Sequence, residues 1–357
     1  MSEIPHEIGK RSESGERLGE IWYNIRYMEY IEPGYLKLYR SGELSRRVGK
    51  LKSRLHACDI CPHNCKIDRL AGERGFCGAA YLPAVASYCA HRGEEPPISG
   101  TRGSGTIFFG NCNMRCLYCQ NYQISQDRQA QLQNEVTVSD LARDMLYLQD
   151  ELKCHNINLV TPSHYVPQIL EAVIEAVPAG FHLPLVYNTS GYDSLETIQL
   201  LDGIIDIYLP DLRYADDRWG KELSGVADYV ERDRAAIKEM YRQVGNLGLD
   251  TAGVALRGLI VRHLILPEQM AGSEDSLRWL VGEVSPDIAL SVMAQYYPAH
   301  RAHRVPALSR RITYEEYAEV TALLHRLDIN NGWVQEMDAS ENYQPDFSRE
   351  GHPFEKG

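Results

Sequence analysis

The sequence has no hydrophobic run that could cross a membrane, because none of its apolar stretches approaches the roughly 18 consecutive residues that a spanning helix needs. Residues 1–6 lack the charged and apolar regions of a signal peptide, and no low-complexity tract or repeat interrupts the chain. Its 357 residues are 44% hydrophobic, which is ample material for one large α/β domain and a smaller one. We therefore expect a globular protein of the cytoplasm that does not bind a membrane.

Positive charge is scarce after the first 57 residues. Residues 1–57 carry a net charge of +3 and the remainder carries −15, which gives −12 for the whole chain. An acidic body of this kind argues against nucleic-acid binding. The basic residues concentrate between Arg46 and Arg54. This run could meet an acidic partner or RNA, but it is more typical of the solvated face of a helix.

A disulfide framework does not fit the nine cysteines, because their number is odd and seven of them stand at spacings typical of metal ligands. Cys112, Cys116 and Cys119 form a C-x3-C-x2-C motif directly after an apolar, strand-like stretch. Three thiolates on one loop can bind three irons of a 4Fe–4S cluster and leave the fourth iron without a protein ligand. An open coordination position is what a catalytic metal site needs. The alternative is three buried structural cysteines, which the spacing disfavours.

A second cysteine set precedes this motif. Cys58, Cys61, Cys65 and Cys77 lie at C-x2-C-x3-C-x11-C spacing in a turn-rich stretch with several glycines. Such a set suits either tetrahedral zinc or a second iron–sulfur cluster, and its alternative is four reduced thiols without a metal. Cys89 and His91 could substitute as ligands, whereas we interpret Cys154 as a structural residue.

From residue 106 onward the hydrophobic pattern alternates between strands and helices. This predicts an α/β fold, a partial (βα)6 barrel with its functional loops after the carboxyl ends of parallel strands. The expected strands are 106–109, 157–161, 184–187, 204–209, 257–265, 288–293 and 333–336. The expected helices are 139–152, 166–178, 194–202, 226–246, 274–284 and 313–327, with N-cap signals at Ser139 and Thr313.

Four segments follow from these patterns. Residues 1–57 are expected to be helical, with one helix over 18–31 and one or two more over 35–55, interrupted near Ser41 and Gly42. Residues 58–100 form the cysteine-rich knuckle, residues 101–340 the barrel, and residues 341–357 a tail. Polar residues follow the strands at Thr161–His164, Asn188–Gly191, Asp211 and Gln295, so we expect them to share one pocket.

The cysteine loop and strand ends resemble the radical S-adenosylmethionine (SAM) superfamily, and within it the pyruvate formate-lyase activating enzymes and an uncharacterised activating-enzyme-like iron–sulfur group. The resemblance rests on the loop Cys112–Asn121, on Tyr187–Gly191, on Tyr208–Arg213 and on Val261–Pro267. It implies a 4Fe–4S cluster with SAM on the open iron, and Tyr118 against the adenine. Carried over, Asn188, Thr189, Asp211 and a carbonyl near Leu209 would hold a monovalent cation beside the SAM carboxylate.

Two departures limit what the resemblance implies about substrate. The Gly-Gly-Glu segment that holds the SAM amine in relatives is replaced by Thr161–His164, and the additional cysteines precede the loop rather than follow it. Strand alternation allows only one of Arg262 and His263 to face the barrel interior, where Arg262 could pair with the SAM carboxylate. Gln295 ends a strand beside the same expected pocket.

The sequence therefore predicts a radical SAM enzyme, an oxidoreductase that cleaves SAM and abstracts hydrogen from an unidentified substrate. The resemblance adds a reductant such as flavodoxin or ferredoxin, and a glycine of a partner enzyme as one candidate substrate. The alternative is an iron–sulfur or zinc protein that serves as a redox or scaffold partner without SAM turnover.

Overall fold

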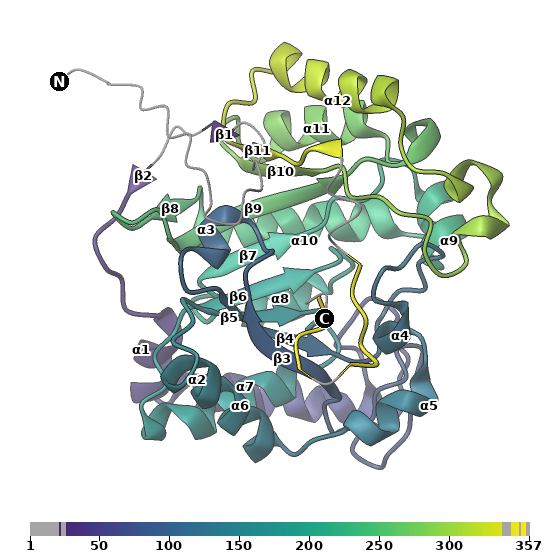
Figure 1. Cartoon of the computed structure of the whole chain (residues 1–357). Helices are drawn as coiled ribbons and strands as arrows, with labels where there is room; N and C mark the ends of the chain where they lie inside the picture. Colours follow the sequence, from purple (N-terminus) through teal and green to yellow (C-terminus); the bar gives the residue numbers. More distant parts are fainter. Residues whose placement is uncertain (1–20, 23–25, 338–343, 350, 355–357) are drawn as a thin grey trace.

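The computed structural model describes residues 21–22, 26–337, 344–349 and 351–354, and within them the chain builds one continuous β-sheet flanked by helices (Figure 1). The strands follow the order β1-β11-β10-β9-β7-β6-β5-β4-β3, and β8 joins β2 to β9 at the side. No helix among the described residues is long and apolar enough to cross a membrane.

Seven strands form the parallel centre of the sheet, and each is connected to the next through at least one helix. They are β4 (Ser104–Phe109), β5 (Ile157–Val160), β6 (Leu185–Thr189), β7 (Ile207–Pro210), β9 (Ala255–Leu264), β10 (Ala289–Met293) and β11 (Gly332–Val334). The edges are antiparallel: β3 (Val85–His91) pairs with β4, and β1 (Ile21–Trp22) pairs with β11. Two short strands, β2 (Arg26–Tyr27) and β8 (Gly248–Leu249), complete the set.

The helices that connect or cover these strands match most of the predicted ones. They are α1 (Gly34–Arg40), α2 (Glu43–Ser53), α3 (Pro96–Ser99), α4 (Tyr122–Ser125), α5 (Arg128–Gln131), α6 (Val138–Asp150), α7 (Val166–Ala176), α8 (Leu195–Leu200), α9 (Asp217–Ser224), α10 (Tyr229–Val244), α11 (Ser273–Glu283) and α12 (Tyr314–Arg326). Figure 1 shows α1, α2, α6 and α7 below the sheet, and α11 and α12 above it.

The barrel is not closed, because β1 and β3 end the strand order without pairing to each other among the described residues. The prediction of an α/β fold with an open, parallel sheet is confirmed, and the predicted strand 333–336 is present as Gly332–Val334. This strand extends the parallel sheet beyond β10, at register Ser291 to Trp333.

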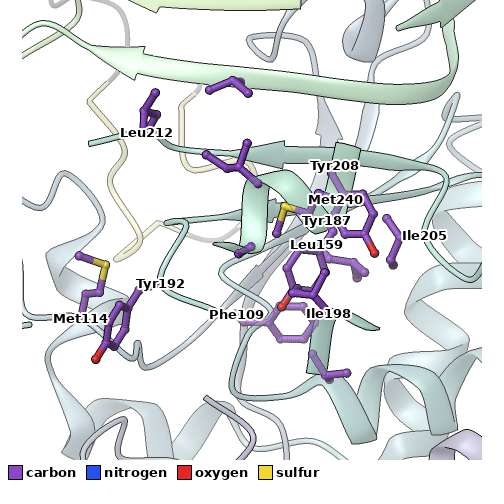
Figure 2. Close-up of a cluster of buried hydrophobic side chains, with 14 of the residues drawn as sticks. Phe109, Met114, Leu159, Tyr187, Tyr192, Ile198, Ile205, Tyr208, Leu212 and Met240 are labelled. Carbon is purple, nitrogen blue, oxygen red and sulfur yellow. The ribbon is translucent and has the colours of Figure 1, made fainter. Parts of the chain in front are cut away.

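The core has two layers because successive side chains of each strand point to opposite faces. Leu159, Tyr187 and Tyr208 belong to the large cluster between sheet and helices, part of which Figure 2 shows. On the inner face, Ile98 of α3 packs with a second cluster whose strand members include Val186, Ile207, Leu209 and Ile260. The strands β4 to β7 are buried at every position, as expected for a parallel sheet covered on both faces.

Because Ile98 belongs to the second cluster, the segment 93–99 packs inside the partial barrel. We call residues 93–99 the plug segment. Its carbonyl at Ile98 accepts a hydrogen bond from Asn156 Nδ2 at 2.8 Å, which ties it to the chain just before β5. Figure 1 shows α3, which ends the plug segment, in front of the central strands.

The N-terminal predictions are partly wrong. The expected helix 18–31 falls partly on residues outside the described ones, and within it β1 and β2 pair as strands with β11 and β8. Helices α1 and α2 confirm the expectation for 35–55, separated by Ser41 and by Gly42 with a φ of 77°. The basic run of α2 makes ion pairs within the chain, including Arg47 to Glu43 and Lys52 to Glu171.

The helix caps correct one prediction and confirm another. The cap of α6 is Thr137 rather than Ser139, and it forms a capping box with Asp140. The capping box of Thr313 with Glu316 begins α12 as predicted.

The segments that were predicted to flank the barrel at either end both contain described residues that pack on its sheet. Strand β3 of the expected knuckle pairs with β4 of the expected barrel along its length. At the other end of the chain, Phe347 and Phe354 pack against Phe108 of β4, with ring centroids 5.4 and 6.0 Å away.

Candidate functional site

The cysteine loop leaves the carboxyl end of β4 through a tight turn at Gly110 and Asn111. A Cβ added to Gly110 would lie 2.1 Å from Gln131 Oε1, so the Gln131 side chain would have to move, and Asn111 has a φ of 66°. The loop is then fixed to the end of α9, because Arg115 N–H donates to Ser224 O and Leu117 N–H donates to Leu223 O, at 2.9 and 2.8 Å. The loop is therefore held by backbone contacts that do not involve its cysteines.

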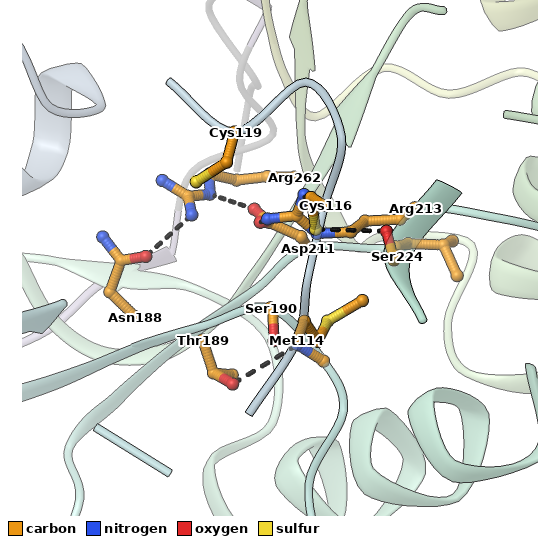
Figure 3. Close-up of polar contacts among 12 residues, drawn as sticks. Met114, Cys116, Cys119, Asn188, Thr189, Ser190, Asp211, Arg213, Ser224 and Arg262 are labelled. Atoms are coloured by element: carbon orange, nitrogen blue, oxygen red, sulfur yellow. Dashed lines mark hydrogen bonds and ion pairs between the residues drawn. The ribbon is translucent and has the colours of Figure 1, made fainter. Parts of the chain in front are cut away.

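Each thiol of the loop has a polar neighbour. Met114 N–H donates to Cys112 Sγ at 3.3 Å, and Ser224 Oγ–H donates to Cys116 Sγ at 3.1 Å, which Figure 3 shows. Cys119 Sγ lies 3.2 Å from Ser125 Oγ. Burial raises the pKa of Cys112 to about 12, and that of Cys119 to about 11, with the Cys116 charge as a further cause in both cases.

Among the described residues, no group of three or more His, Cys, Asp or Glu side chains is placed to hold a metal ion. A single zinc ion would need its thiolates about 3.8 Å apart, as follows from Zn–S bonds of about 2.3 Å in a tetrahedron. A cubane binds each thiolate to a different iron, so its ligands stand further apart. The chemistry of three thiols on one loop fits such a cluster. The positions of the thiols would change on binding, as is usual when metal binding and folding are coupled.

A cavity of about 230 Å³ lies beside this loop at the carboxyl ends of the parallel strands. Five of the six predicted cofactor residues line it together with Cys119: Tyr118, Asn188, Asp211, Arg262 and Gln295. The strand-end residues thus meet in one pocket with the cysteine loop, as the parallel topology predicts.

Arg262 joins two of these strand ends (Figure 3). Its Nε donates to Asp211 Oδ1 and its Nη2 donates to Asn188 Oδ1, each at 2.7 Å. Asp211 also forms an ion pair with Arg213, whose Nη1 lies 3.8 Å from Cys116 Sγ. Arg213 therefore extends the polar network from the strand ends to the cysteine loop.

Of the predicted ligands of the monovalent cation, Asn188 and Asp211 line the cavity and Thr189 does not. Asn188 and Asp211 give their oxygens to Arg262, which already supplies a positive charge there. Thr189 faces away from the cavity and donates to Asp193 Oδ2 at 2.5 Å, because neighbouring residues of β6 point to opposite faces.

The same alternation decides between Arg262 and His263. Arg262 lines the cavity, whereas His263 points to the opposite face of β9 and is fully buried there. Its Nδ1 lies 2.8 Å from Leu212 O, and its Nε2 lies 2.8 Å from Ser273 Oγ. Burial lowers the pKa of His263 to about 4, so the ring is a neutral core residue.

Tyr118 connects the cavity to a cysteine ligand through hydroxyl groups. Its Oη lies 2.5 Å from Tyr214 Oη, which lies 2.7 Å from Ser224 Oγ, the donor to Cys116. The Tyr118 ring packs edge-on against Tyr296 with centroids 5.8 Å apart. Gln295 receives hydrogen bonds from Gln120 and Gln335, which fixes the far wall.

The second cysteine set lies directly against the cysteine loop. Burial raises the pKa of Cys61, and Cys77, Cys58 and Cys65 raise it further, so the four thiols share one electrostatic neighbourhood. Phe76, next to Cys77, accepts a hydrogen bond from Arg115 through its carbonyl and stacks on His63 at 3.8 Å. Sequence reasoning missed Arg69, a buried cation whose Nη1 lies 4.0 Å from Cys58 Sγ.

Sequence reasoning also missed Glu94 and Glu95, which line the cavity from the plug segment. They lie before a four-residue helix and not at a strand end, so the strand-end rule could not find them. Two adjacent acids next to Pro96 were the available signal.

No family model matches the chain. It is 26% identical over 320 residues to an uncharacterised protein of Methanocaldococcus jannaschii, covering 86% of this chain and 83% of that protein. A second uncharacterised protein of the same organism is 36% identical over 90 residues, which are 22% of this chain and 26% of the relative. Among solved structures, HydG, described as a maturase of the FeFe-hydrogenase, has a TM-score of 0.40 and 11% identity over 62% of this chain and 49% of HydG. Neither relative's name states an activity.

Proposed function

We propose that the protein is a radical SAM enzyme, an oxidoreductase of the activating-enzyme-like kind. The observation that carries the proposal is the shared cavity: Cys119 of a C-x3-C-x2-C loop and the strand-end residues Asn188, Asp211 and Arg262 line the same space. An electron carrier or scaffold has no need of such a cavity beside its cluster, which favours the enzyme over a redox or scaffold protein.

Cys112, Cys116 and Cys119 would hold a 4Fe–4S cluster, and the cavity would receive SAM. When bound, such a cluster supplies one electron to the SAM sulfonium, and the 5′-deoxyadenosyl radical so formed abstracts hydrogen from the substrate. Tyr118 offers an aromatic wall for the adenine, with its ring position fixed by Tyr296. Arg262 offers a guanidinium to the SAM carboxylate, and Phe354 helps exclude water from the cavity.

Electrons would come from a reductant such as flavodoxin or ferredoxin in a reducing cytoplasm. The closeness of the two cysteine sets supports a relay: Arg115 Nη1 donates to Cys112 O at 2.7 Å, and its Nη2 donates to the carbonyl of Phe76, next to Cys77. Cys58, Cys61, Cys65 and Cys77 would bind either zinc or a second cluster. The hydrogen donor is either a small molecule or a glycine in a partner enzyme.

The test is anaerobic reconstitution, reduction and incubation with SAM. We expect 5′-deoxyadenosine and methionine from the wild type, and none from Cys112→Ala, Cys116→Ala or Cys119→Ala. Cys154→Ala is the matched control, since this buried cysteine lies outside both sets and should leave turnover intact. Wild-type turnover in any of the three loop variants would show that the ligands are assigned wrongly. A cluster-containing protein that never cleaves SAM would favour the redox or scaffold alternative.

A further inference from the structure

Two carboxylates of the plug segment enter the cavity without a strong partner. Glu95 is only 8% exposed, lines the cavity, and its Oε2 has no hydrogen-bond partner among the described residues. Glu94 lines the same cavity. No cationic side chain among the described residues forms an ion pair with either carboxylate within 4.0 Å. Burying an unpaired carboxylate is costly, so a positive charge is missing from this place.

The charges around the cavity have the same imbalance. Asp211 is shared by Arg213 and Arg262, so these two guanidinium groups face three carboxylates once both Glu94 and Glu95 are ionised, which in the ligand-free cavity happens only above about pH 8. Burial opposes the charge on Arg262, but Asp211, Glu95 and Glu94 together raise its pKa. One further cation in the cavity would balance the set.

The cavity also has two electrically distinct parts. Arg213 is influenced by Cys116 and Tyr118 at the cysteine loop, in addition to Asp211. Arg262 is influenced by Glu95 and Glu94 of the plug segment, again with Asp211. Asp211 and Arg262 therefore lie between a part next to Cys116, which Arg213 reaches at 3.8 Å, and a part lined by Glu94 and Glu95, here called the floor.

We propose that Glu94 and Glu95 form a binding site for an organic cation, an alkylammonium or guanidinium group, and that this group belongs to the substrate. The inference rests on the proposed function, because it assigns SAM to the part beside the cysteine loop and the substrate to the floor. It is specific about charge: the hydrogen-donating molecule carries a positive group that the two carboxylates accept.

The pH dependence follows from the same residues. Burial, then the charge of Glu95, raises the pKa of Glu94 to about 8 in the ligand-free cavity, with Asp211 adding to it and Arg262 opposing it. His91 also lines the cavity, but burial lowers its pKa to about 3, so it stays neutral. A cation must displace the Glu94 proton below about pH 8. Cation affinity should therefore rise with pH up to about 8, by at most tenfold per pH unit, and level off above.

The experiment uses the reconstituted full chain and isothermal titration calorimetry between pH 6 and 8.5. The probe is n-butylammonium, and the uncharged n-pentanol is its analogue. We expect n-butylammonium to bind at least tenfold more tightly than n-pentanol, with and without saturating SAM. Glu94→Gln and Glu95→Gln should each lower the cation affinity at least tenfold. Glu171→Gln is the matched control, because Glu171 pairs with Lys52 outside the cavity.

Wild-type measurements keep the test decisive even if a variant fails to fold. Equal affinity for the cation and the alcohol, or competition between n-butylammonium and SAM, would overturn the inference. SAM cleavage without cation binding would contradict the cation site but not the proposed function. Cation binding without SAM cleavage would contradict the proposed function but not the cation site. A second arm compares free L-lysine with a blocked Gly-Lys-Gly peptide: tighter binding of the former indicates a small metabolite, and of the latter a basic residue in a polypeptide.

Discussion

Asp211 is the residue on which the charges of the site depend. It is buried, and it neutralises Arg262, with 2.7 Å between Oδ1 and Nε, as well as Arg213. Removing its charge would leave two buried guanidinium groups without the carboxylate that pairs directly with both. Residues that act on two neighbours in this way determine the position of both.

Asp211→Asn should raise the SAM concentration needed for half-maximal cleavage by about tenfold, because Arg262 loses the partner that orients it. It should also lower the free energy of unfolding by about 3 kcal/mol, the usual cost of breaking a buried ion pair. Iron content should not change. Asp275→Asn, at an exposed site in α11, is the control and should stay within about 0.5 kcal/mol of the wild type. An unchanged SAM requirement in Asp211→Asn would exclude Asp211 from the site.

Single residues also show where sequence reasoning succeeds and where it stops. The alternation of strand side chains correctly allowed only one of Arg262 and His263 into the cavity. The same rule applied to β6 separates Asn188 from Thr189, so the sequence alone could have shown that the two side chains do not enter one pocket. The sequence does not show that Arg262 contacts Asp211 and Asn188, because these two residues lie 51 and 74 positions away from it in the chain.

At the scale of elements, the seven parallel strands were predictable because each is a short apolar run between helical patterns. The plug segment was not. Its four-residue helix has no periodicity to detect, and its place is fixed by packing of Ile98 in a cluster with residues of the strands β6 to β11. The short pairings of β1 and β2 were likewise hidden beneath a helical pattern, since pairing with β11 and β8 overrides local preference.

The cysteine-rich element before β3 should bind one metal centre of its own. Metal analysis with Mössbauer spectroscopy on the wild type and on Cys58→Ala/Cys61→Ala tests this. We expect the double variant to lose zinc, or about four irons, and to keep the loop cluster. A separate loss is expected because the loop is fixed by its own contacts to Ser224 and Leu223. About four irons per chain without zinc, and no loss in the variant, would mean that these cysteines bind nothing.

At the scale of the whole molecule, β3 and β1 lie at the two edges of the sheet. The expected knuckle contributes β3, and Phe354 stacks on His91 at 4.6 Å beside the cavity. When Glu94 and Glu95 are both ionised, three carboxylates face two guanidinium groups in this cavity, which agrees with a site that holds a cation.

The central claim is that three cysteines hold a cluster whose fourth iron binds SAM in this cavity. Electron–nuclear double resonance on the reduced, reconstituted protein tests it directly, with SAM labelled by ¹⁵N at the amino group and by ¹⁷O at the carboxylate. The account predicts magnetic coupling of both labels to the cluster in the wild type, and the same coupling in the Cys58→Ala/Cys61→Ala variant. A cluster with normal iron content that shows no coupling to either label would contradict it.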